Sequence, residues 1–438
     1  MTYEGIARRL RGRLWIGYAV GVSVWVTWCL SMALGPGAWR DHEGSLISAD
    51  HIAFYSAARL IREGQQAHIY DHEFIGRYQA SLVWYDWQTL IAYRNPPFYA
   101  LLYLPTAGLS FVGSMVVWQF VGLACLVGSI LLLRPEHPAR VLVWSLCFYP
   151  IFSVVGFGQN TFLSLLAFAA VYRLAADGRL FAAGLAGGLL WYKPQLLIGL
   201  FIWWGLMPVR YARCWAGVIV TGAALAAVSW LAVPEASRAF VESLGKNVAY
   251  RGENMWNKQS PRAFWALILP LDHPTSENEV NPVILGLAAA CALAGVGVAA
   301  WVARRTGGPV DVMFPLAVFL SLWASPHALI YEWAIMVAAA VVLWERFPDR
   351  RDAWLTLFTV VWLVLNTSTT VAKFQIDRKW PVVLQYSVPV LGAVGWLVAR
   401  ELVRAAGQRV DSGGHALTTA DEPDSRRLAG GPGSPAGR

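Results

Sequence analysis

The sequence predicts an all-α polytopic membrane protein with about 12 transmembrane helices. Hydrophobic residues make up 57% of the 438-residue chain and charged residues only 14%, whereas a soluble protein has about 25% charged residues to cover its surface. The mean hydropathy is +0.46, and the apolar residues gather in runs that can cross a hydrocarbon core of roughly 30 Å. Most of the surface should therefore contact lipid.

The chain begins with a basic segment, residues 1–13, and continues with an apolar run from Leu14 to about Gly35. This run is too long for the core of a signal peptide and lacks a clear cleavage site, so it predicts an uncleaved first span with a cytoplasmic N-terminus. Further apolar runs predict the other spans, at residues 112–133, 139–156, 161–176, 180–192, 195–209, 213–233, 282–303, 311–324, 327–344, 353–371 and 382–400.

The side on which each later loop lies depends on residues 97–111. This segment is short for a span and carries Pro97 and Pro105, so we interpret it as interfacial or re-entrant. Five short loops that carry arginine then fall on the cytoplasmic side, as the positive-inside rule requires. Their arginines are Arg134, Arg140, Arg173, Arg179, Arg210, Arg213, Arg304, Arg305, Arg346, Arg350 and Arg351.

With this topology a membrane domain covers residues 14–400, and two long loops, about 36–96 and 234–281, lie outside the cell. Residues 401–438 are rich in Gly, Pro, Ser and charge, which predicts a disordered cytoplasmic tail. In the first outer loop, a helix from Asp50 to Gly64 is predicted to lie parallel to the membrane. One face would carry Phe54, Ala57, Ala58 and Ile61, and the other Ser56, Arg59 and Glu63.

The unusual polar motifs all fall on the outer side of this topology. They are Asp50-His51, Tyr93-Arg94-Asn95-Pro96-Pro97, Gly158-Gln159-Asn160, Tyr192-Lys193-Pro194-Gln195, Asn257-Lys258-Gln259-Ser260, and Ser325-Pro326-His327 with Tyr331-Glu332. Random placement would distribute such motifs over both sides. Their convergence predicts a single extracytoplasmic cavity at the membrane surface.

Two of these residues illustrate the choice between a structural and a functional interpretation. Asp50 could cap the helix that follows it, and the helix N-terminus would also favour its ionised form. Lys193 lies between two apolar runs and could extend its ammonium group to the lipid headgroups. However, ionisable groups at membrane depth are costly and often functional, and an ammonium group is a good phosphate ligand.

The other motifs leave the same choice open. His327 and Glu332 could pair at the end of a span. Gln159 and Asn160 could form only a turn between two spans. Arg94, beside two prolines, could be an interfacial anchor.

Several familiar chemistries have no support in the sequence. It contains no Walker A pattern, no G-x-G-x-x-G motif that follows a strand, no H-E-x-x-H and no G-x-S-x-G. The histidines are scattered and the five cysteines fall in or beside apolar runs, so we expect no metal, no disulfide and no cofactor. We interpret the net charge of +8 as arginines at cytoplasmic membrane ends and expect no nucleic-acid partner.

The ordered motifs resemble those of the GT-C superfamily of membrane glycosyltransferases, and most closely glycosyltransferase family 87. The resemblance runs from about residue 48 to 335. Its segments are Asp50 with Phe54-Tyr55-Ser56-Ala57-Ala58-Arg59, Ile69-Tyr70-Asp71, Asn95-Pro96-Pro97 and the four later motifs given above. It implies a GT-C-type fold with interfacial helices in the first extracytoplasmic loop.

Enzymes of this family use a polyprenyl-phosphate sugar, typically mannose, and act with inversion on the extracytoplasmic face. The resemblance implies that Asp50 is the catalytic base and that the partners are this donor, a lipid or glycan acceptor and the lipids of a bacterial plasma membrane. The candidate donor- or acceptor-binding residues are Tyr55, Arg94, Gln159, Asn160, Lys193, Gln195, Asn257, Gln259, Ser260, His327 and Glu332.

Two positions depart from the family pattern. The family usually has a plain aromatic residue before Pro-Pro, where this chain has Arg94-Asn95, and it often has Asp where Glu332 stands. Both departures bear on the identity of the sugar. The chemistry nevertheless suits the residues, because a carboxylate can deprotonate the acceptor hydroxyl. Lys193, Arg94 and a protonated His327 could stabilise the departing phosphate.

Two other classes of protein compete with this interpretation. A lipid or sugar-lipid transporter could also have about twelve spans, but it should show repeat symmetry and charges at the membrane midplane. Here the polar motifs are predicted at one interface. A non-catalytic scaffold of envelope synthesis would tolerate the loss of Asp50.

Overall fold

The computed structural model describes residues 2–37, 39–83, 91–244, 255–269, 281–380 and 382–418. Over these residues the regular structure is helical, and β structure is limited to two isolated bridges, Arg40 with Leu46 and Lys258 with Leu329. The predicted all-α fold class is therefore confirmed.

Among the described residues, five helices are long and apolar enough to cross a membrane. They are α2 (Leu14–Ala33), α6 (Phe111–Leu133), α12 (Pro208–Ala232), α15 (Pro282–Thr306) and α18 (Arg351–Asp377). A sixth candidate is the pair α7 (Pro138–Leu146) and α8 (Tyr149–Phe157), which is bent by 69°. All of them fall on predicted apolar runs.

The other predicted runs form shorter helices, interrupted helices or, for the last run, the start of a long one. They are α9 (Thr161–Ala176), α10 (Leu180–Gly188) with η4 (Leu189–Tyr192), η5 (Pro194–Leu197) with α11 (Ile198–Leu206), α16 (Val310–Trp323), η7 (Ile330–Ile335) with α17 (Met336–Arg346), and α19 (Ser387–Thr418). Helix is thus present at every predicted run, while length and composition identify five spans, or six with the bent pair.

Proline accounts for the main interruptions. Pro150 stands in the first turn of α8, where its missing N–H is tolerated, and it cannot continue α7. Pro194 disfavours the helical conformation in the residue before it. Lys193 accordingly adopts φ −134° and ψ 73° and lies at a break between η4 and η5. A polar side chain is thereby placed between two apolar segments.

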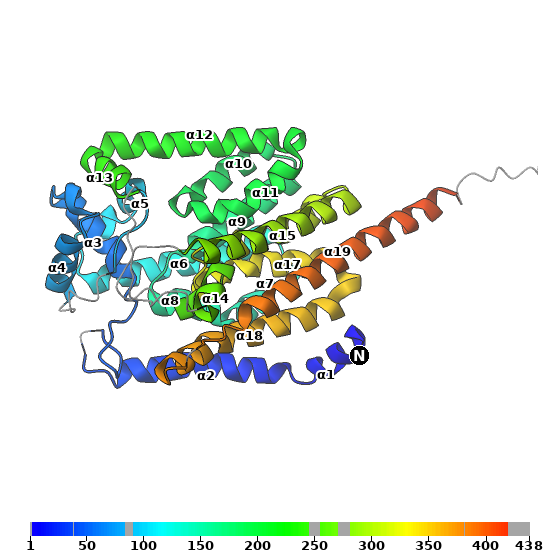
Figure 1. Cartoon of the computed structure of the whole chain (residues 1–438), viewed down its shortest axis with the longest axis horizontal. Coiled ribbons are helices and arrows are strands. Elements are labelled where there is room, and N and C mark those ends of the chain that lie inside the picture. The colour runs from blue at the N-terminus through cyan, green and yellow to red at the C-terminus, as the bar shows by residue number, and fades with distance from the viewer. Residues whose placement is uncertain are drawn as a thin grey trace, which may run out of the picture.

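Short helices lie in the segments predicted as outer loops and in residues 97–111, the segment predicted to be interfacial or re-entrant. They are α3 (His51–Arg62), η1 (Gln66–His68), α4 (His72–Val83), α5 (Pro97–Leu101), η3 (Leu104–Thr106), α13 (Pro234–Leu244), η6 (Met255–Asn257) and α14 (Pro261–Ile268). Between residues 97 and 110 the structure has only α5 and η3, each too short to cross a membrane. Helices α3, α4, α5 and α13 lie at one end of the molecule (Figure 1).

The surroundings of α3 differ from the prediction. The sequence predicts an amphipathic helix lying along the membrane surface, but in the structure its neighbours cover most of its surface. Ser56, expected on the polar face, is 0% exposed, and its hydroxyl accepts a hydrogen bond from Nε2 of Gln79 in α4 at 3.2 Å. The helical periodicity of a sequence shows which residues share a face. It does not show whether another helix covers that face.

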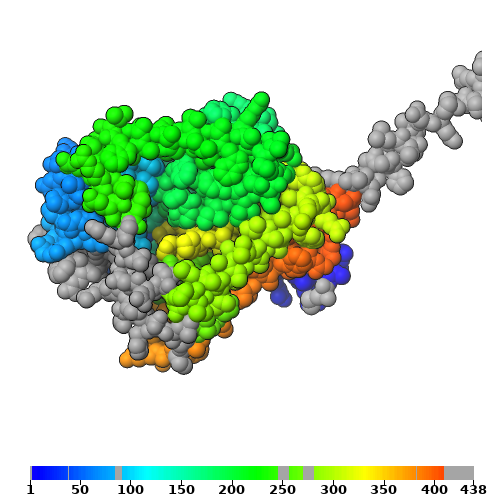
Figure 2. Space-filling model, turned by 45° about the horizontal axis from the view of Figure 1, so that its top comes forward, coloured from blue at the N-terminus to red at the C-terminus, as the bar shows by residue number. Residues whose placement is uncertain are grey.

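The largest hydrophobic core lies among the central helices and includes the fully buried Trp203, Trp204, Trp333 and Trp354. Helices α10 and α12 approach very closely, because any side chain at Gly184 would overlap the backbone of Cys214. Figure 2 shows the surface hollowed between the green α10–α12 region and the yellow-green α15 region, with yellow atoms, the colour of α17, at its floor.

Several arginine-bearing segments meet at the other end of the molecule. Arg11, the last residue of α1 (Tyr3–Arg11), pairs with Asp352 of α18. Arg351 lies 3.8 Å from Glu136 in the loop between α6 and α7. In Figure 1 the N-terminus lies at the end away from α3 and α4. This arrangement is expected if these segments share one side of the membrane.

The last helix continues past the predicted domain boundary at residue 400. α19 ends at Thr418 and projects beyond the rest of the described structure (Figure 1). Residues 401–418 of the predicted tail are therefore helical, and residues 419–438 lie outside the described residues.

Candidate active site

Asp50 stands immediately before α3 and faces the turn between α8 and α9. Its Oδ2 accepts a hydrogen bond from Nε2 of Gln159 at 2.7 Å. Its backbone N–H donates to the carbonyl of Phe157 at 3.0 Å. A side-chain contact and a backbone contact thus hold two distant parts of the chain together at this carboxylate.

Gly158 makes this close approach possible. It adopts φ 70° and ψ 37° at the end of α8, a left-handed conformation that glycine adopts without strain. A Cβ at this position would lie only 2.7 Å from Cβ of Ser48 and 3.1 Å from Cβ of His51. The motif around Gln159 is therefore a turn between two helices, and it also supports the hydrogen-bond partner of Asp50.

Asp50 does not cap α3. It has helical dihedral angles, φ −66° and ψ −20°, and its side chain accepts no capping hydrogen bond from the described residues of the helix. Burial raises the pKa of this carboxyl group to about 6, against the lowering effects of the Gln159 hydrogen bond and the charge of Lys193. A carboxyl group with this pKa is mostly ionised at neutral pH and can still take up a proton, as a general base must.

Lys193 and Glu332 form a buried ion pair. Nζ of Lys193 lies 3.3 Å from Oε1 of Glu332, and the two side chains are 10% and 2% exposed. Nζ also lies 5.4 Å from the centroid of the Tyr331 ring, which is 6.0 Å from the ring of Phe157 at the end of α8. The ammonium group therefore does not extend to the headgroups, and the interpretation of Lys193 as a membrane anchor is wrong.

His327 and Glu332 do not pair with each other. Nε2 of His327 lies 3.4 Å from Nη1 of Arg262 in α14, whereas Glu332 pairs with Lys193. No motif in the sequence points to Arg262. It brings a further cation to the segment before η7.

The motif at 257–260 lies against the segment that leads into η7. The backbone N–H of Gln259 donates to the carbonyl of Ala328 at 2.7 Å. The Gln259 side chain turns instead toward α18 and α19, where its Oε1 accepts hydrogen bonds from Ser368 at 3.1 Å and from Ser387. Gln259 therefore joins the segment that leads into η7 to α18 and α19, and its side chain does not reach Asp50.

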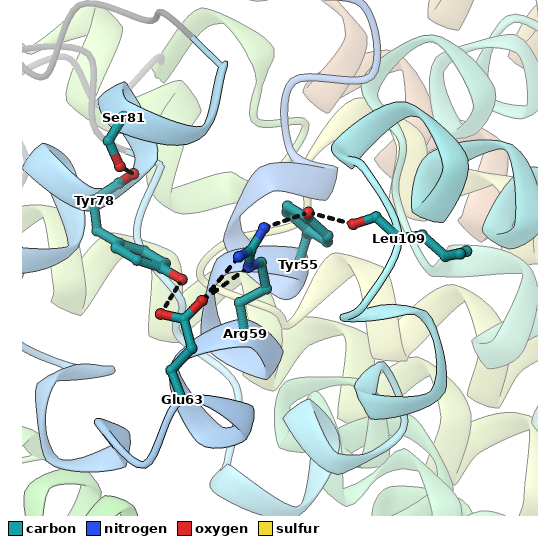
Figure 3. Close-up of polar contacts among 6 residues, drawn as sticks. All are labelled: Tyr55, Arg59, Glu63, Tyr78, Ser81 and Leu109. Carbon is teal, nitrogen blue, oxygen red and sulfur yellow. Dashed lines mark hydrogen bonds and ion pairs between the residues drawn. The ribbon is translucent and has the colours of Figure 1, made fainter.

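Tyr55 is engaged in a different polar network, shown in Figure 3. Its hydroxyl donates to the carbonyl of Leu109 at 2.7 Å and accepts a hydrogen bond from Nη1 of Arg59 at 3.2 Å. Arg59 also pairs with Glu63 at 2.9 Å, and Glu63 accepts a hydrogen bond from the Tyr78 hydroxyl at 2.7 Å. These contacts join α3 to α4 and to the segment before α6, so Tyr55 helps to fix the helix that Asp50 precedes.

Asn95 is a further residue that the sequence analysis left out of the candidate set. It is buried, and its Nδ2 donates to the carbonyl of Tyr192 at 2.9 Å. This bond attaches the segment before α5 to the break that contains Lys193. The neighbouring Arg94, which was a candidate, is exposed.

The three remaining candidates have local surroundings of their own. Gln195 is half-buried in η5, and Asn257 is buried at the end of η6. Ser260 caps α14, because its Oγ accepts the backbone N–H of Ala263 at 3.4 Å.

Gln119 is another polar residue that belongs to none of the predicted motifs. It lies in the apolar helix α6, and its Nε2 donates to Oγ of Ser48 at 3.1 Å and to the carbonyl of Val155 at 2.9 Å. It therefore fixes the loop before Asp50 against α8. A signal was available, because an amide side chain inside an otherwise apolar span is costly unless it is hydrogen-bonded.

The structure thus gathers five of the predicted residues around one centre: Asp50, Gln159, Asn160, Lys193 and Glu332. Four of them stand where a helix begins, ends or is interrupted, and Glu332 lies within η7. The arrangement offers a carboxylate to take a proton and a cation within electrostatic reach of it. Over the described ranges, no group of three or more His, Cys, Asp or Glu side chains could hold a metal ion.

The known proteins that this chain resembles are glycosyltransferases. A model of "Glycosyltransferase family 87" matches residues 93–326, just over half of the chain, a range that begins after Asp50 and ends before His327. A relative from Mycolicibacterium smegmatis is named polyprenol-phosphate-mannose-dependent alpha-(1-2)-phosphatidylinositol pentamannoside mannosyltransferase. It is 27% identical over 340 residues, which cover 70% of this chain and 77% of the relative. A protein of the same name from Mycobacterium tuberculosis is 25% identical over 346 residues, or 71% and 74% of the two chains. No solved structure matches.

Proposed function

Because the chain belongs to glycosyltransferase family 87, as the ordered motifs indicate, we propose that it transfers mannose from a polyprenyl-phosphate donor to a lipid-linked acceptor. The proposed site of transfer is the extracytoplasmic face of a bacterial plasma membrane. Both relatives are named as polyprenol-phosphate-mannose-dependent mannosyltransferases. The observation that carries the proposal within the structure is the Asp50 carboxylate, bonded to Gln159 and within electrostatic reach of Lys193.

In the proposed reaction, Asp50 takes the proton from an acceptor hydroxyl. The hydroxyl oxygen forms a bond to the anomeric carbon while the bond from that carbon to the phosphate oxygen breaks on the opposite face. The configuration therefore inverts, and the bonding electron pair leaves with polyprenyl phosphate. The products are a glycoside and polyprenyl phosphate, and the proton later passes from Asp50 to solvent.

The departing phosphate gains negative charge, which a nearby cation stabilises. Lys193 is suited to this role because its ammonium group is held in place by Glu332 and acts electrostatically on Asp50. A strong acid is not required, because polyprenyl phosphate, a phosphate monoester, leaves readily without protonation.

The direct test is a transfer assay with the purified full-length protein in proteoliposomes. Polyprenyl phosphates carrying mannose, arabinose or glucose are offered with a mycobacterial lipid extract as acceptor. We expect a new glycolipid from the mannose donor. Passage of intact donor across the bilayer without a new glycosidic bond would instead support a transporter.

The proposed topology makes a prediction about access. In a background lacking the five native cysteines, Gln65→Cys, in the exposed turn after α3, should react with an impermeant maleimide on intact cells. Ala176→Cys, at the exposed end of α9, should react only after the membrane is permeabilised. Labelling of position 176 on intact cells would overturn the topology.

The raised pKa of Asp50 makes a prediction about pH. A base must be deprotonated to act, so kcat/KM should be constant above pH 6 and should fall about tenfold per pH unit below it. Gln159→Leu removes a hydrogen bond that lowers this pKa, so its profile should be displaced toward higher pH. An unchanged inflection in Gln159→Leu would remove Asp50 as the titrating base.

A further inference from the structure

One buried tyrosine contacts both of the segments that act on Asp50. Tyr192, the last residue of η4, is 5% exposed and immediately precedes Lys193. Its hydroxyl donates a hydrogen bond to the carbonyl of Asn160 at 3.3 Å, and Asn160 is the residue after Gln159. A single side chain therefore joins the segment that carries the Lys193 ammonium group to the turn that carries the hydrogen-bond donor of Asp50.

The position of Tyr192 is fixed by three further contacts. Its ring stacks on the ring of Tyr99 in α5, with the centroids 4.4 Å apart and the planes at 8°. Its hydroxyl shares a hydrogen bond of 2.5 Å with the hydroxyl of Ser164 in α9. Its backbone carbonyl accepts Nδ2 of Asn95 at 2.9 Å. The ring, the hydroxyl and the backbone of this residue are all held, so its side chain can act as a rigid spacer.

The two segments that Tyr192 joins are not held to Asp50 in the same way. The turn is attached directly, because the backbone N–H of Asp50 donates to the carbonyl of Phe157 at 3.0 Å. The backbone hydrogen bonds that Lys193 makes within the described structure are local, with the carbonyl of Leu190 at 2.8 Å and the N–H of Leu196 at 2.9 Å. The distance from the ammonium group to Asp50 therefore depends on side-chain contacts.

We infer that Tyr192 is a positioning residue that holds the Lys193 ammonium group in register with the Asp50 carboxylate. This inference rests on the proposed function, in which the same ammonium group stabilises the departing phosphate. Both effects of Lys193 depend on its position, because an electrostatic interaction weakens with distance. A misplacement of about 1 Å can cost about a hundredfold in rate. Tyr192 acts through Lys193 and needs no contact with the substrates.

Tyr192→Phe tests this role, because it removes the hydroxyl and keeps the ring that stacks on Tyr99. The hydroxyl of Ser164 can then donate to the carbonyl of Asn160, four residues earlier in the chain, so no buried hydroxyl is left unpaired. The melting temperature should therefore stay close to that of the wild type. With decaprenyl-phosphate mannose and a mycobacterial lipid extract, kcat/KM for the donor should fall at least about tenfold.

The pH profile distinguishes positioning from a purely structural role. The charge of Lys193 lowers the pKa of Asp50, so a displaced ammonium group lowers it less and the pKa rises. The acidic limb of kcat/KM in Tyr192→Phe should therefore begin at a higher pH than in the wild type. A loss of folded protein alone would reduce the rate at every pH and leave the inflection in place.

Asn95→Leu and Tyr99→Phe complete the comparison. Asn95→Leu removes the other attachment of Tyr192, the bond to its backbone carbonyl, and should displace the inflection in the same direction. It decides the question if Tyr192→Phe does not fold. Tyr99→Phe is the matched control, because it removes the hydroxyl of the stacked ring, whose partner is the hydroxyl of Tyr103 at 3.3 Å. Its activity and inflection should match the wild type.

The last arm repeats Tyr192→Phe in a protein that carries Lys193→Met and Glu332→Gln. A residue that acts through the ammonium group should have no further effect on the inflection once that charge is absent.

Three results would overturn the inference. They are an unmoved inflection in the Tyr192→Phe and Asn95→Leu variants that fold, an equal displacement in Tyr99→Phe, and an undiminished displacement in the background without the ion pair. Failure of the wild-type protein to use any polyprenyl-phosphate sugar would be a different result, and it would refute the proposed function itself.

Discussion

An Asp50→Asn protein should insert, fold and bind donor, but transfer sugar at least about a hundredfold more slowly than the wild type. Asparagine has nearly the size of aspartate, and its carbonyl oxygen can accept the hydrogen bond that Gln159 donates. It cannot take a proton from the acceptor hydroxyl. Loss of a positioned general base typically costs about 10²–10⁴-fold in rate.

The structure sharpens this test, because capping no longer competes as an explanation. The Asp50 side chain accepts no capping hydrogen bond from the described helix, so the substitution removes no cap. The measurement is kcat in proteoliposomes, together with donor binding and the melting temperature. Asp41→Asn is the control: it is a half-buried acid in the same outer loop whose Oδ1 accepts the backbone N–H groups of Glu43 and Ser45. Near-normal turnover of Asp50→Asn would favour the transporter or the scaffold.

The sequence predicts the helices of this protein well, because apolar runs bounded by proline and glycine are strong local signals. The interruption at Pro194 and the turn at Gly158 are set by backbone sterics, which local sequence determines. The number of membrane spans is harder to predict from the sequence. Helices such as α9 and α16 are shorter than a membrane crossing, and their neighbours in the fold decide how they lie, not their own composition.

The sequence predicts the motifs that form the candidate site, but it does not predict which side chains of these motifs contact one another. Gln159 bonds to Asp50 across 109 positions, and Glu332 pairs with Lys193, whereas the sequence had left open a pairing of Glu332 with His327. The local sequence shows that a buried polar group needs a hydrogen-bond or ion-pair partner. The tertiary packing determines which residue that partner is. For the same reason Gln259 was a plausible ligand in sequence but turns away in the structure.

The buried pair of Lys193 and Glu332 gives the second large expected effect. Lys193→Ala should abolish most donor use, but it would also leave the Glu332 carboxylate buried without its partner. Breaking a buried pair in this way typically destabilises a protein by about 3–5 kcal/mol. The single variant therefore confounds stability with catalysis.

The double variant Lys193→Met, Glu332→Gln separates the two. It keeps the side-chain volumes and leaves no buried charge, so it should melt near the wild-type temperature. It should nevertheless lose about 10²–10³-fold in kcat/KM for the donor, the effect expected when a group that stabilises departing negative charge is removed. The single variant Lys193→Arg should retain more donor use than the double variant but less than the wild type. The reason is that a planar guanidinium group cannot reproduce the geometry of an ammonium group.

The pH profile supplies an independent signature of the same residue. The charge of Lys193 lowers the pKa of Asp50, so the double variant should titrate at higher pH than the wild type. A double variant that melts normally and turns over the donor at the wild-type rate would show that the pair serves only the fold. The phosphate would then have to be stabilised by other cations of this region, and Arg262, 3.4 Å from His327, would be the next residue to replace.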